Sequence, residues 1–397
     1  MTTTTSGKAN ACRVCGGPSP EMFFRVEGVP VQDGLLWPSR AEAAAAPTGD
    51  IELVFCGRCG YIGNRAFDPG LLQYHPGYDI SLHHSPVYRE FIDGLVARLV
   101  RDHDLRGKAV IEIGSGKGDF LRALCEAGGN RGVGFDPTST APEISSGPVR
   151  LIRDFYSEKF ASEDVDLLCC RHVLNSIEDL RGFVGMVRRA LGDRTRSLVY
   201  FEVPDGAVIF RRRVVWNVVY EHCSFFTIPS LSRLFTESGF EVRAVAPCFR
   251  DEYLGIEASP APASVARGGA AESVEVEALA REISTFGAIY REKVARWSDW
   301  LAGLRLAGRT AVLWGSGARA VSFLSALRPG EEVPFLVDIN PKRQGLHMPR
   351  TAQPVAAPES LAAKPPDELL ITNPAFETEI RGQAAALGFP GQIRVLD

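Results

Sequence analysis

The central part of the chain alternates short apolar runs with amphipathic stretches. The apolar runs have the length of buried strands, and the amphipathic stretches repeat apolar residues at helical spacing. Alternation of this kind is typical of an α/β fold with a doubly wound parallel sheet. The predicted strands are 109–113, 132–135, 165–170 and 197–203, and the predicted helices are 120–127, 180–191 and 230–238.

The same patterns divide the rest of the chain. An amphipathic helix is predicted before the central strands, at residues 85–104, and a low-complexity linker after them, at 259–271. Apolar residues at helical spacing then predict one long helix over 272–304, which we interpret as a strut. A second, smaller α/β unit follows, with predicted strands at 311–314, 334–337 and 368–372. We therefore predict four parts, at 1–80, 81–260, 261–305 and 306–397.

Composition and charge narrow the class of protein. The chain has 397 residues, with 44 Lys+Arg against 48 Asp+Glu and a formal net charge of −4. This balance gives no general attraction to nucleic acid or to anionic lipid. The first ten residues lack an apolar core, and no uncharged apolar run approaches the ~18 residues of a membrane span. We expect a cytoplasmic protein, either a monomer or a small homo-oligomer, that binds neither nucleic acid nor membranes.

Four of the nine cysteines form two Cys-x-x-Cys pairs, Cys12 with Cys15 and Cys56 with Cys59, each followed by glycine. This spacing lets both thiolates of a pair reach one tetrahedral ion, and the glycines permit a tight turn. A redox Cys-x-x-Cys pair normally occurs once, at a strand-to-helix junction. The sequence therefore predicts a structural Zn²⁺ site with a closed four-sulfur shell, in preference to four unrelated thiols.

A glycine loop joins the first central strand to the first central helix. Gly114, Gly116 and Gly118 follow the G-x-G-x-G spacing, and Glu112 stands two residues before the loop. Glycines let the backbone approach a nucleotide closely, and the free N–H groups at the start of a helix face the ligand. The spacing departs from the G-x-G-x-x-G of dinucleotide loops. It resembles motif I of the class I S-adenosylmethionine-dependent methyltransferases.

Two acidic residues follow at the spacing that this resemblance implies. Asp136 comes about 20 residues after the glycines, where a carboxylate can accept from both ribose hydroxyls. Asp154, with Phe155 beside it, is placed like the acid that accepts from the adenine amino group in these enzymes. Either acid alone could equally be a turn residue. Three elements in this order favour a site for S-adenosylmethionine.

A second glycine loop opens the C-terminal unit. Gly315 and Gly317 follow a predicted strand, and Asp338 comes about 20 residues later, which fits the dinucleotide spacing better than the first loop does. The loop by itself suggests NAD. A Rossmann-like unit that keeps the turn without a redox cofactor is the alternative.

The order of these motifs resembles the three-domain C-methyltransferases that act on thymidine-diphosphate-linked 4-keto-6-deoxy sugars in antibiotic pathways. The resemblance implies a zinc module, a Rossmann-like methyltransferase domain that binds the methyl donor, and a C-terminal Rossmann-like domain toward which the substrate nucleotide lies. It implies a nucleotide-diphosphate sugar as the small-molecule substrate. The motifs that carry it are the four cysteines, the loop of Gly114 to Gly118, the run Tyr220-Glu221-His222-Cys-Ser224-Phe-Phe226, the run Val337-Asp338-Ile-Asn340-Pro341-Lys342-Arg-Gln344-Gly345, Pro366-Asp367 and Asn373-Pro-Ala-Phe376-Glu-Thr-Glu379-Ile380.

The resemblance also implies roles at the acceptor site. Methylation of a carbon beside a ketone needs a base for the α-proton and stabilisation of the enolate. His222 is the predicted base, because imidazole titrates near working pH, and Glu221 orients it or binds a sugar hydroxyl. Tyr220 or Tyr78 is predicted to donate to the enolate oxygen, and His172 to face the transferred methyl group. A lone histidine near Phe225 and Phe226 would otherwise be read as a core residue.

Three other functions stay open from the sequence. An O- or N-methyltransferase is the nearest, because Val219, Tyr220 and Ile80 stand where the family has Tyr, His and Tyr. An NAD-dependent oxidoreductase would use the Gly315 loop, although no Tyr-x-x-x-Lys pair follows that loop. A protein that keeps the donor fold without catalysis is the third.

Overall fold

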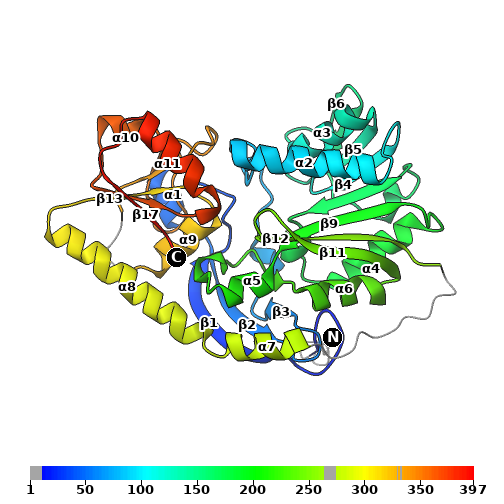
Figure 1. The fold of residues 1–397 in the computed structure, drawn as a ribbon, viewed down its shortest axis with the longest axis horizontal. Coiled ribbons are helices and arrows are strands. Elements are labelled where there is room, and N and C mark those ends of the chain that lie inside the picture. Colours follow the sequence, from blue (N-terminus) through cyan, green and yellow to red (C-terminus); the bar gives the residue numbers. More distant parts are fainter. Residues whose placement is uncertain (1–10, 263–273, 329, 331–332) are drawn as a thin grey trace, which may run out of the picture.

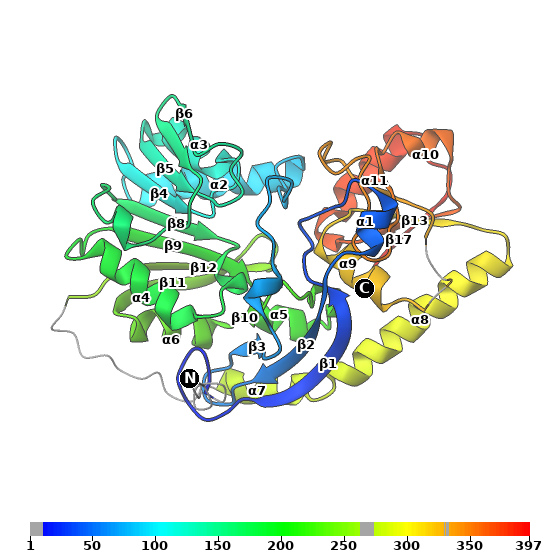
Figure 2. The same ribbon diagram turned by 180° about the vertical axis from the view of Figure 1, so that it is seen from behind.

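Three β-sheets organise the chain, and the computed structural model describes residues 11–262, 274–328, 330 and 333–397. In Figure 1 the eight-stranded sheet lies in one lobe and the five-stranded sheet in the other, with helix α8 (Phe286–Leu306) along the second lobe. Figure 2 shows strands β1 (Glu21–Pro30) and β2 (Thr48–Phe55) of the four-stranded sheet passing beneath both lobes. The N-terminal sheet therefore joins the other two.

The N-terminal sheet has the order β1-β2-β3-β10. Strands β1 and β2 form a long antiparallel hairpin, and β2 pairs with β3 (Ile62–Asn64). The last strand, β10 (Ser224–Phe225), comes from the predicted central part and pairs with β3 through Ser224 with Gly63 and Phe225 with Ile62. This sheet therefore crosses the predicted boundary at residue 80, which local sequence patterns do not reveal. A short helix, α1 (Arg40–Ala44), lies in the hairpin connection.

The central sheet has the order β11-β12-β9-β8-β4-β5-β7-β6. Its five middle strands, β9, β8, β4, β5 and β7, are parallel, which confirms the predicted α/β class with a Rossmann-like sheet. The antiparallel strands at its edges were not predicted. The strands are β4 (Ala109–Ile113), β5 (Arg131–Phe135), β6 (Glu143–Ser146), β7 (Val149–Ile152), β8 (Leu167–Arg171), β9 (Leu198–Pro204), β11 (Phe240–Cys248) and β12 (Tyr253–Pro260). The helices around them are α2 (Pro86–Asp102), α3 (Asp119–Gly128), α4 (Leu180–Leu191), α5 (Gly206–Arg211) and α6 (Ile228–Glu237).

The predicted long helix is two helices, α7 (Val274–Ile283) and α8. The hydroxyl of Ser284 donates to the carbonyl of Arg281 at 2.7 Å, and that of Thr285 donates to Glu282 at 3.1 Å. Side-chain hydroxyls that bond nearby backbone carbonyls compete with a continuous helix, so the break falls at these two residues.

The predicted linker was also partly wrong. Ser259 and Pro260 belong to β12 and pair with β11, and residues 263–271 of the predicted linker lie outside the described residues. The helices that follow are packed against the N-terminal sheet, since the ring of Phe286 lies 5.2 Å from that of Phe24 and 4.8 Å from that of Phe210. The strut therefore shares a core with β1.

The C-terminal unit is a five-stranded parallel sheet with the order β15-β14-β13-β16-β17. The predicted strands at 311–314, 334–337 and 368–372 correspond to β13, β14 and β16. The strands are β13 (Ala311–Trp314), β14 (Leu336–Val337), β15 (Val355–Ala356), β16 (Glu368–Ile371) and β17 (Gln392–Val395), and the helices are α9 (Ala318–Ala326), α10 (Ser360–Ala363) and α11 (Glu377–Ala386). The unit is thus a small Rossmann-like domain.

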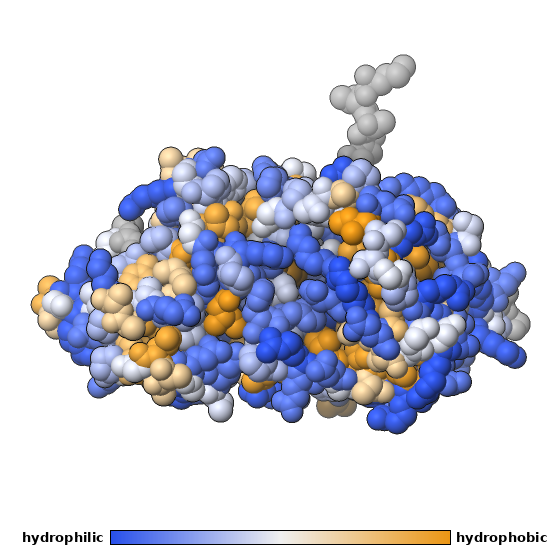
Figure 3. Space-filling model, turned by 90° about the horizontal axis from the view of Figure 1, so that it is seen from above, coloured by the Kyte–Doolittle hydropathy of each residue, from blue (hydrophilic) through white to orange (hydrophobic). Residues whose placement is uncertain are grey.

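The molecular surface is mainly polar. Figure 3 shows apolar side chains in separate groups among polar ones on the face seen from above. Within the part of the chain that the structure describes, every helix is too short or too polar to cross a bilayer.

Candidate functional site

The first glycine loop turns from β4 into α3 at the carboxyl edge of the central sheet. Gly114, Gly116 and Gly118 all have positive φ, at 70°, 54° and 78°. A Cβ on Gly114 would lie 2.2 Å from a methyl group of Val173, so only glycine fits there. In open α/β sheets, ligands bind at this edge.

Two buried polar groups of this loop region lack a partner among the described residues. They are Oε2 of Glu112 and the hydroxyl of Ser115. Burial raises the pKa of Glu112 to about 8, and the carboxylates of Asp136 and Asp119 add to the rise while Arg171 opposes it. Unpaired buried polar groups are costly, which indicates that these atoms serve a ligand.

Asp136 directly follows β5 and closes the glycine loop. Its Oδ2 accepts from the N–H of Gly116 at 2.7 Å, and its Oδ1 accepts from the N–H of Thr138 at 2.8 Å. Oδ1 also accepts from the hydroxyl of Thr138 at 2.5 Å, so Oδ2 is the oxygen that keeps a lone pair for a ribose hydroxyl.

Asp154 follows β7 at the same edge of the sheet. Its side chain accepts from Lys159 at 2.5 Å and from the N–H of Phe155 at 2.8 Å. The ring of Phe155 is 60% exposed and lies 5.6 Å from that of Tyr74, edge to face. The pKa of Tyr74 is raised by burial and by the charges of Glu221, Cys223 and Asp136.

His172 directly follows β8 and has the left-handed φ of 56°, which is uncommon outside glycine. Its Nε2 lies 2.8 Å from Oε1 of Glu202, without the alignment of a hydrogen bond, and its ring contacts Tyr253 at 4.5 Å. Burial would raise the pKa of the fully buried Glu202, but Arg171, paired with it at 2.8 Å, and His172 together outweigh burial and lower that pKa. An ionised carboxylate therefore stands behind His172.

Glu221 is buried between two segments of the N-terminal module. Its Oε1 accepts from the hydroxyl of Tyr78 at 2.6 Å, and its Oε2 accepts from the N–H of Asp33 at 3.3 Å. Burial and the Asp33 carboxylate raise the pKa of Glu221 well above its ordinary value. Both Tyr78 and Glu221 are therefore favoured in their protonated forms near neutral pH.

The neighbouring His222 is poised as a neutral imidazole. Burial lowers its pKa, Asp33 opposes that change, and His172 adds to it. Its buried Nδ1 finds no hydrogen-bond partner in the described parts of the chain. A neutral imidazole with a free nitrogen can accept a proton.

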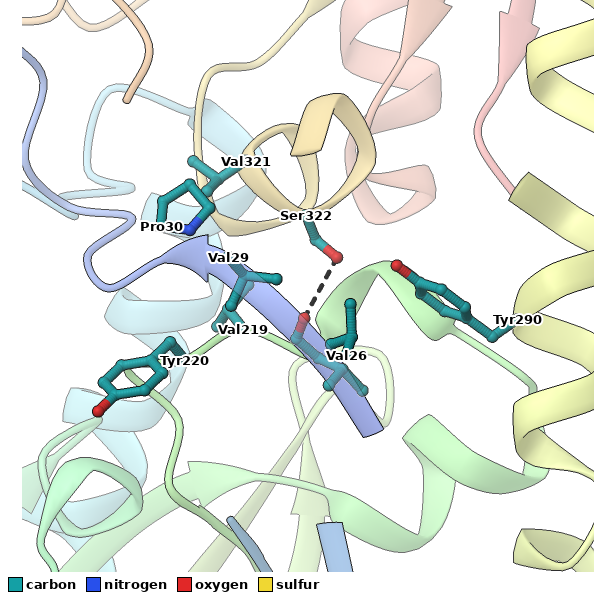
Figure 4. Close-up of a pocket in the computed structure, with 9 residues that line it drawn as sticks. Val26, Val29, Pro30, Val219, Tyr220, Tyr290, Val321 and Ser322 are labelled. Atoms are coloured by element: carbon teal, nitrogen blue, oxygen red, sulfur yellow. Dashed lines mark hydrogen bonds between the residues drawn. The ribbon is translucent and has the colours of Figure 1, made fainter. Parts of the chain in front are cut away.

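Tyr220 lies apart from this cluster. Its hydroxyl accepts from the N–H of Asp68 at 2.8 Å, and its ring packs on Phe67 at 5.3 Å within the N-terminal core. Figure 4 shows Tyr220 beside a narrow apolar crevice between β1 and α9, with its hydroxyl pointing away from the other labelled residues. Of the two tyrosines predicted to donate to an enolate, the structure brings only Tyr78 to Glu221.

The four cysteines converge. All four Sγ atoms lie within 4.8 Å of one another, with 3.6 Å between Cys12 and Cys59 and 3.7 Å between Cys15 and Cys56. Sulfurs at about 2.3 Å from a tetrahedral zinc would be about 3.8 Å apart, so the cluster fits Zn²⁺. The cluster packs in the same apolar core as the central sheet.

Polar groups of the second glycine loop form hydrogen bonds with other residues of the C-terminal unit. Oδ2 of Asp338 accepts from both the N–H and the hydroxyl of Ser316, at 2.9 and 2.6 Å. The same hydroxyl accepts from the buried guanidinium of Arg343 at 2.8 Å. The carboxylate that a dinucleotide site would offer to a ribose is thus bonded within the loop.

The sequence did not predict three residues that the structure places near the candidate site, Asp33, Tyr74 and Glu202. Glu202 left a signal, because it is an acid inside the run 198–203, whose other residues are apolar or aromatic. Asp33 and Tyr74 are polar residues in irregular segments, so no periodicity or motif distinguishes them.

Comparisons with known proteins agree with this arrangement. Residues 83–245 match the model of a methyltransferase domain, and residues 259–393 match that of a C-methyltransferase C-terminal domain. The curated C-methyltransferase NovU from Streptomyces niveus is 25% identical in an alignment of 386 positions that covers 91% of this chain and 88% of the relative.

Solved methyltransferases resemble part of the chain. The magnesium protoporphyrin IX methyltransferase ChlM from Synechocystis, with bound S-adenosylhomocysteine, is 14% identical with a TM-score of 0.34, over 44% of this chain and 84% of that one. A putative S-adenosylmethionine-dependent methyltransferase from Listeria monocytogenes is 12% identical with a TM-score of 0.33, over 44% of this chain and all of that one.

The two matched domains, in this order, and the relative that extends along most of the chain identify the protein's family. The chain is an S-adenosylmethionine-dependent methyltransferase and belongs to the C-methyltransferases in which a methyltransferase domain is followed by a dedicated C-terminal domain.

Proposed function

We propose that the protein methylates a carbon next to a ketone in a nucleotide-diphosphate-linked deoxy sugar, for natural-product or surface-sugar biosynthesis. The observation that carries this proposal is the buried hydrogen bond of Tyr78 to Glu221, at 2.6 Å, together with His222, the next residue in the chain, whose Nδ1 has no partner among the described residues. A phenol and a neutral imidazole in one buried region suit proton removal from carbon with stabilisation of an enolate. The sugar acceptor rests on the family resemblance of the motifs.

The residues at the carboxyl edge of the central sheet fit the methyl donor. S-adenosylmethionine supplies an electrophilic methyl group on a positively charged sulfur. Because residues 114, 116 and 118 are glycines, a ligand can approach the backbone of the loop closely. Glu112 and Ser115 offer this ligand polar atoms that are otherwise unpaired. Asp136 binds the ribose, and Asp154 with Phe155 borders the adenine.

The acceptor-side residues divide the remaining tasks. His222 removes the α-proton, and Tyr78 donates a hydrogen bond to the enolate oxygen through the hydroxyl that Glu221 now accepts. Glu221 holds Tyr78 in place through its 2.6 Å hydrogen bond and can bind a sugar hydroxyl. His172 faces the transferred methyl group, with its ring oriented by Glu202 and Tyr253.

The four cysteines hold one zinc ion, for folding. With all four positions filled by sulfur, the ion has no open site for water or substrate. Its place in the core of the central domain suits a structural role, because loss of the ion would leave four buried thiols in contact.

An O- or N-methyltransferase is the second candidate. Val219 and Ile80 stand where the resembled family carries tyrosines, so the acceptor side is less polar than that family's pattern. An oxidoreductase is less well supported, because no Tyr-x-x-x-Lys pair follows the Gly315 loop.

The function is tested by incubating the protein with methyl-labelled S-adenosylmethionine and a panel of nucleotide-linked keto-deoxy sugars. We expect label on a carbon next to the ketone, located by tandem mass spectrometry, and no label on sugars whose ketone has been reduced. Label on oxygen or nitrogen would support the second candidate instead. Release of S-adenosylhomocysteine without a methylated sugar would contradict both.

Replacing His222 by Gln or Ala should lower kcat by about 10²- to 10⁴-fold, the usual contribution of a general base. Affinity for S-adenosylhomocysteine, measured by calorimetry, should stay within about twofold, since His222 lies outside the glycine loop. On the acid side, kcat/KM of the unchanged enzyme should begin to fall below the ordinary pH range of histidine, because the pKa of His222 is lowered and the base is active when neutral. Near wild-type turnover in both variants would exclude this base.

Donor binding should release a proton from Glu112. With a pKa of about 8 in the free protein, this carboxyl is protonated at pH 7, and a positively charged donor favours its ionised form. Affinity should therefore weaken by up to about tenfold for each pH unit below 8. Calorimetry in buffers of different ionisation enthalpy would count the released protons. Glu112→Gln should release fewer, and equal counts in the two proteins would contradict the assignment.

Purified protein should contain one zinc ion per chain by inductively coupled plasma mass spectrometry. Cys56→Ser should lose the ion and lower the melting temperature, because three sulfurs no longer close the shell. Cys125→Ser is the control, since Cys125 is equally buried and outside the cluster. Full zinc content in Cys56→Ser would show that this residue is not a ligand.

A further inference from the structure

Arg343 forms hydrogen bonds to both the C-terminal glycine loop and the N-terminal module. Its residue surface is 6% exposed, and its guanidinium donates four hydrogen bonds. Two go to Ser316 of the glycine loop, at 2.8 Å to the hydroxyl and 2.6 Å to the carbonyl. The other two go to the carbonyls of Asp79, at 2.6 Å, and Asp33, at 3.2 Å.

The two carbonyls belong to the segments that hold Glu221. Asp33 donates its N–H to one oxygen of Glu221, and Tyr78, the residue before Asp79, donates its hydroxyl to the other. The segments are also joined directly, because the N–H of Asp79 donates to the carbonyl of Gly34 at 2.9 Å. Arg343 therefore fixes the spacing of the two donors that Glu221 accepts from.

A second set of contacts ties Asp79 to the same loop of the C-terminal unit. The amide of Asn340 donates to Oδ1 of Asp79 at 3.1 Å, and Nζ of Lys342 lies 3.5 Å from its Oδ2. The four bonds come from three guanidinium nitrogens held in one plane, whereas a lysine ammonium has three donors on a single nitrogen and cannot make all four. The full set of four hydrogen bonds therefore requires an arginine at position 343.

We propose that Arg343 is a positioning residue of the acceptor site. It acts through Asp33 and Tyr78 to hold Glu221, and through Glu221 the adjacent His222. The C-terminal glycine loop serves as the anchor of this contact. The proposal rests on the proposed function, because it assigns Arg343 to the reaction of the Glu221 and His222 pair.

Arg319 provides a matched control. It belongs to the same unit, is 7% exposed, and also donates across to other parts of the chain. Its described partners are Asn217 and Asn373, each at 2.6 Å, and Glu252 at 2.7 Å. All three lie outside the group of Asp33, Tyr78 and Glu221.

The test compares Arg343→Lys, Arg343→Met and Arg319→Met in the zinc-loaded full chain, with the sugar substrate found above. Both Arg343 variants should lose at least about tenfold in kcat, and their affinity for S-adenosylhomocysteine should stay within about twofold. Water reaching a loosened Glu221 should bring its pKa down, so turnover should decline on the alkaline side at a lower pH than in the unchanged enzyme. Arg319→Met should keep the original pH profile.

Hydrogen exchange measured by mass spectrometry gives a readout that needs no turnover. Exchange of a peptide covering residues 73–81 should rise in Arg343→Lys and stay unchanged in Arg319→Met. The proposal would be overturned if the Arg343 and Arg319 variants had the same hydrogen exchange, the same loss of kcat and the same pH profile. Arg343 would then only join two units of the chain.

Glu221→Gln, assayed in parallel, distinguishes a failure of the proposed function from a failure of the role proposed for Arg343. Wild-type turnover in Glu221→Gln would overturn the proposed function at this cluster, and the proposal for Arg343 with it. A slowed Glu221→Gln together with Arg343 variants that match Arg319→Met would overturn the proposal for Arg343 alone.

Discussion

Two residue pairs, Ser224 with Gly63 and Phe225 with Ile62, hold the acceptor site together. Through this short antiparallel contact the chain leaves the central domain, adds a strand to the N-terminal sheet and returns to α6. Glu221 and His222 lie directly before that strand, so the pairing decides where they point. The strand that β10 pairs with, β3, also leads into the segment that carries Tyr78. This pairing and the ring contact of Tyr74 with Phe155 fix the proposed acceptor residues relative to the glycine loop of the central domain.

The two halves of the site are built on different physical bases. On the donor side, residues follow the ends of parallel strands, and backbone geometry places Gly114, Asp136 and His172 at one edge. On the acceptor side, buried hydrogen bonds between segments far apart in sequence place Asp33, Tyr78 and Glu221. Buried polar contacts of this kind are costly when half made, so the acceptor side depends on all its partners being present.

This difference explains what the sequence could predict. The sheet class, the two glycine loops and the cysteine pairs follow from spacing within a few residues. Asp136 follows from its place at the end of the next predicted strand, about 20 residues after the glycine loop. Asp33, Tyr74 and Arg343 act through contacts between distant segments, and such contacts leave no periodic pattern. Tyr220 was misjudged for the same reason, because its adjacency to Glu221 in sequence hides that its ring faces the N-terminal core. The break between α7 and α8 depends on two side-chain hydroxyls, which apolar spacing does not register.

The late arrival of β10 in the chain also has a consequence for biosynthesis. During translation the ribosome releases β1, β2 and β3 long before residues 224 and 225, so the edge of β3 waits unpaired while most of the central domain emerges. An open strand edge is a template for unwanted pairing with other chains. Both cysteine pairs are complete by residue 59, so the four thiols of the N-terminal module can come together well before its last strand is made.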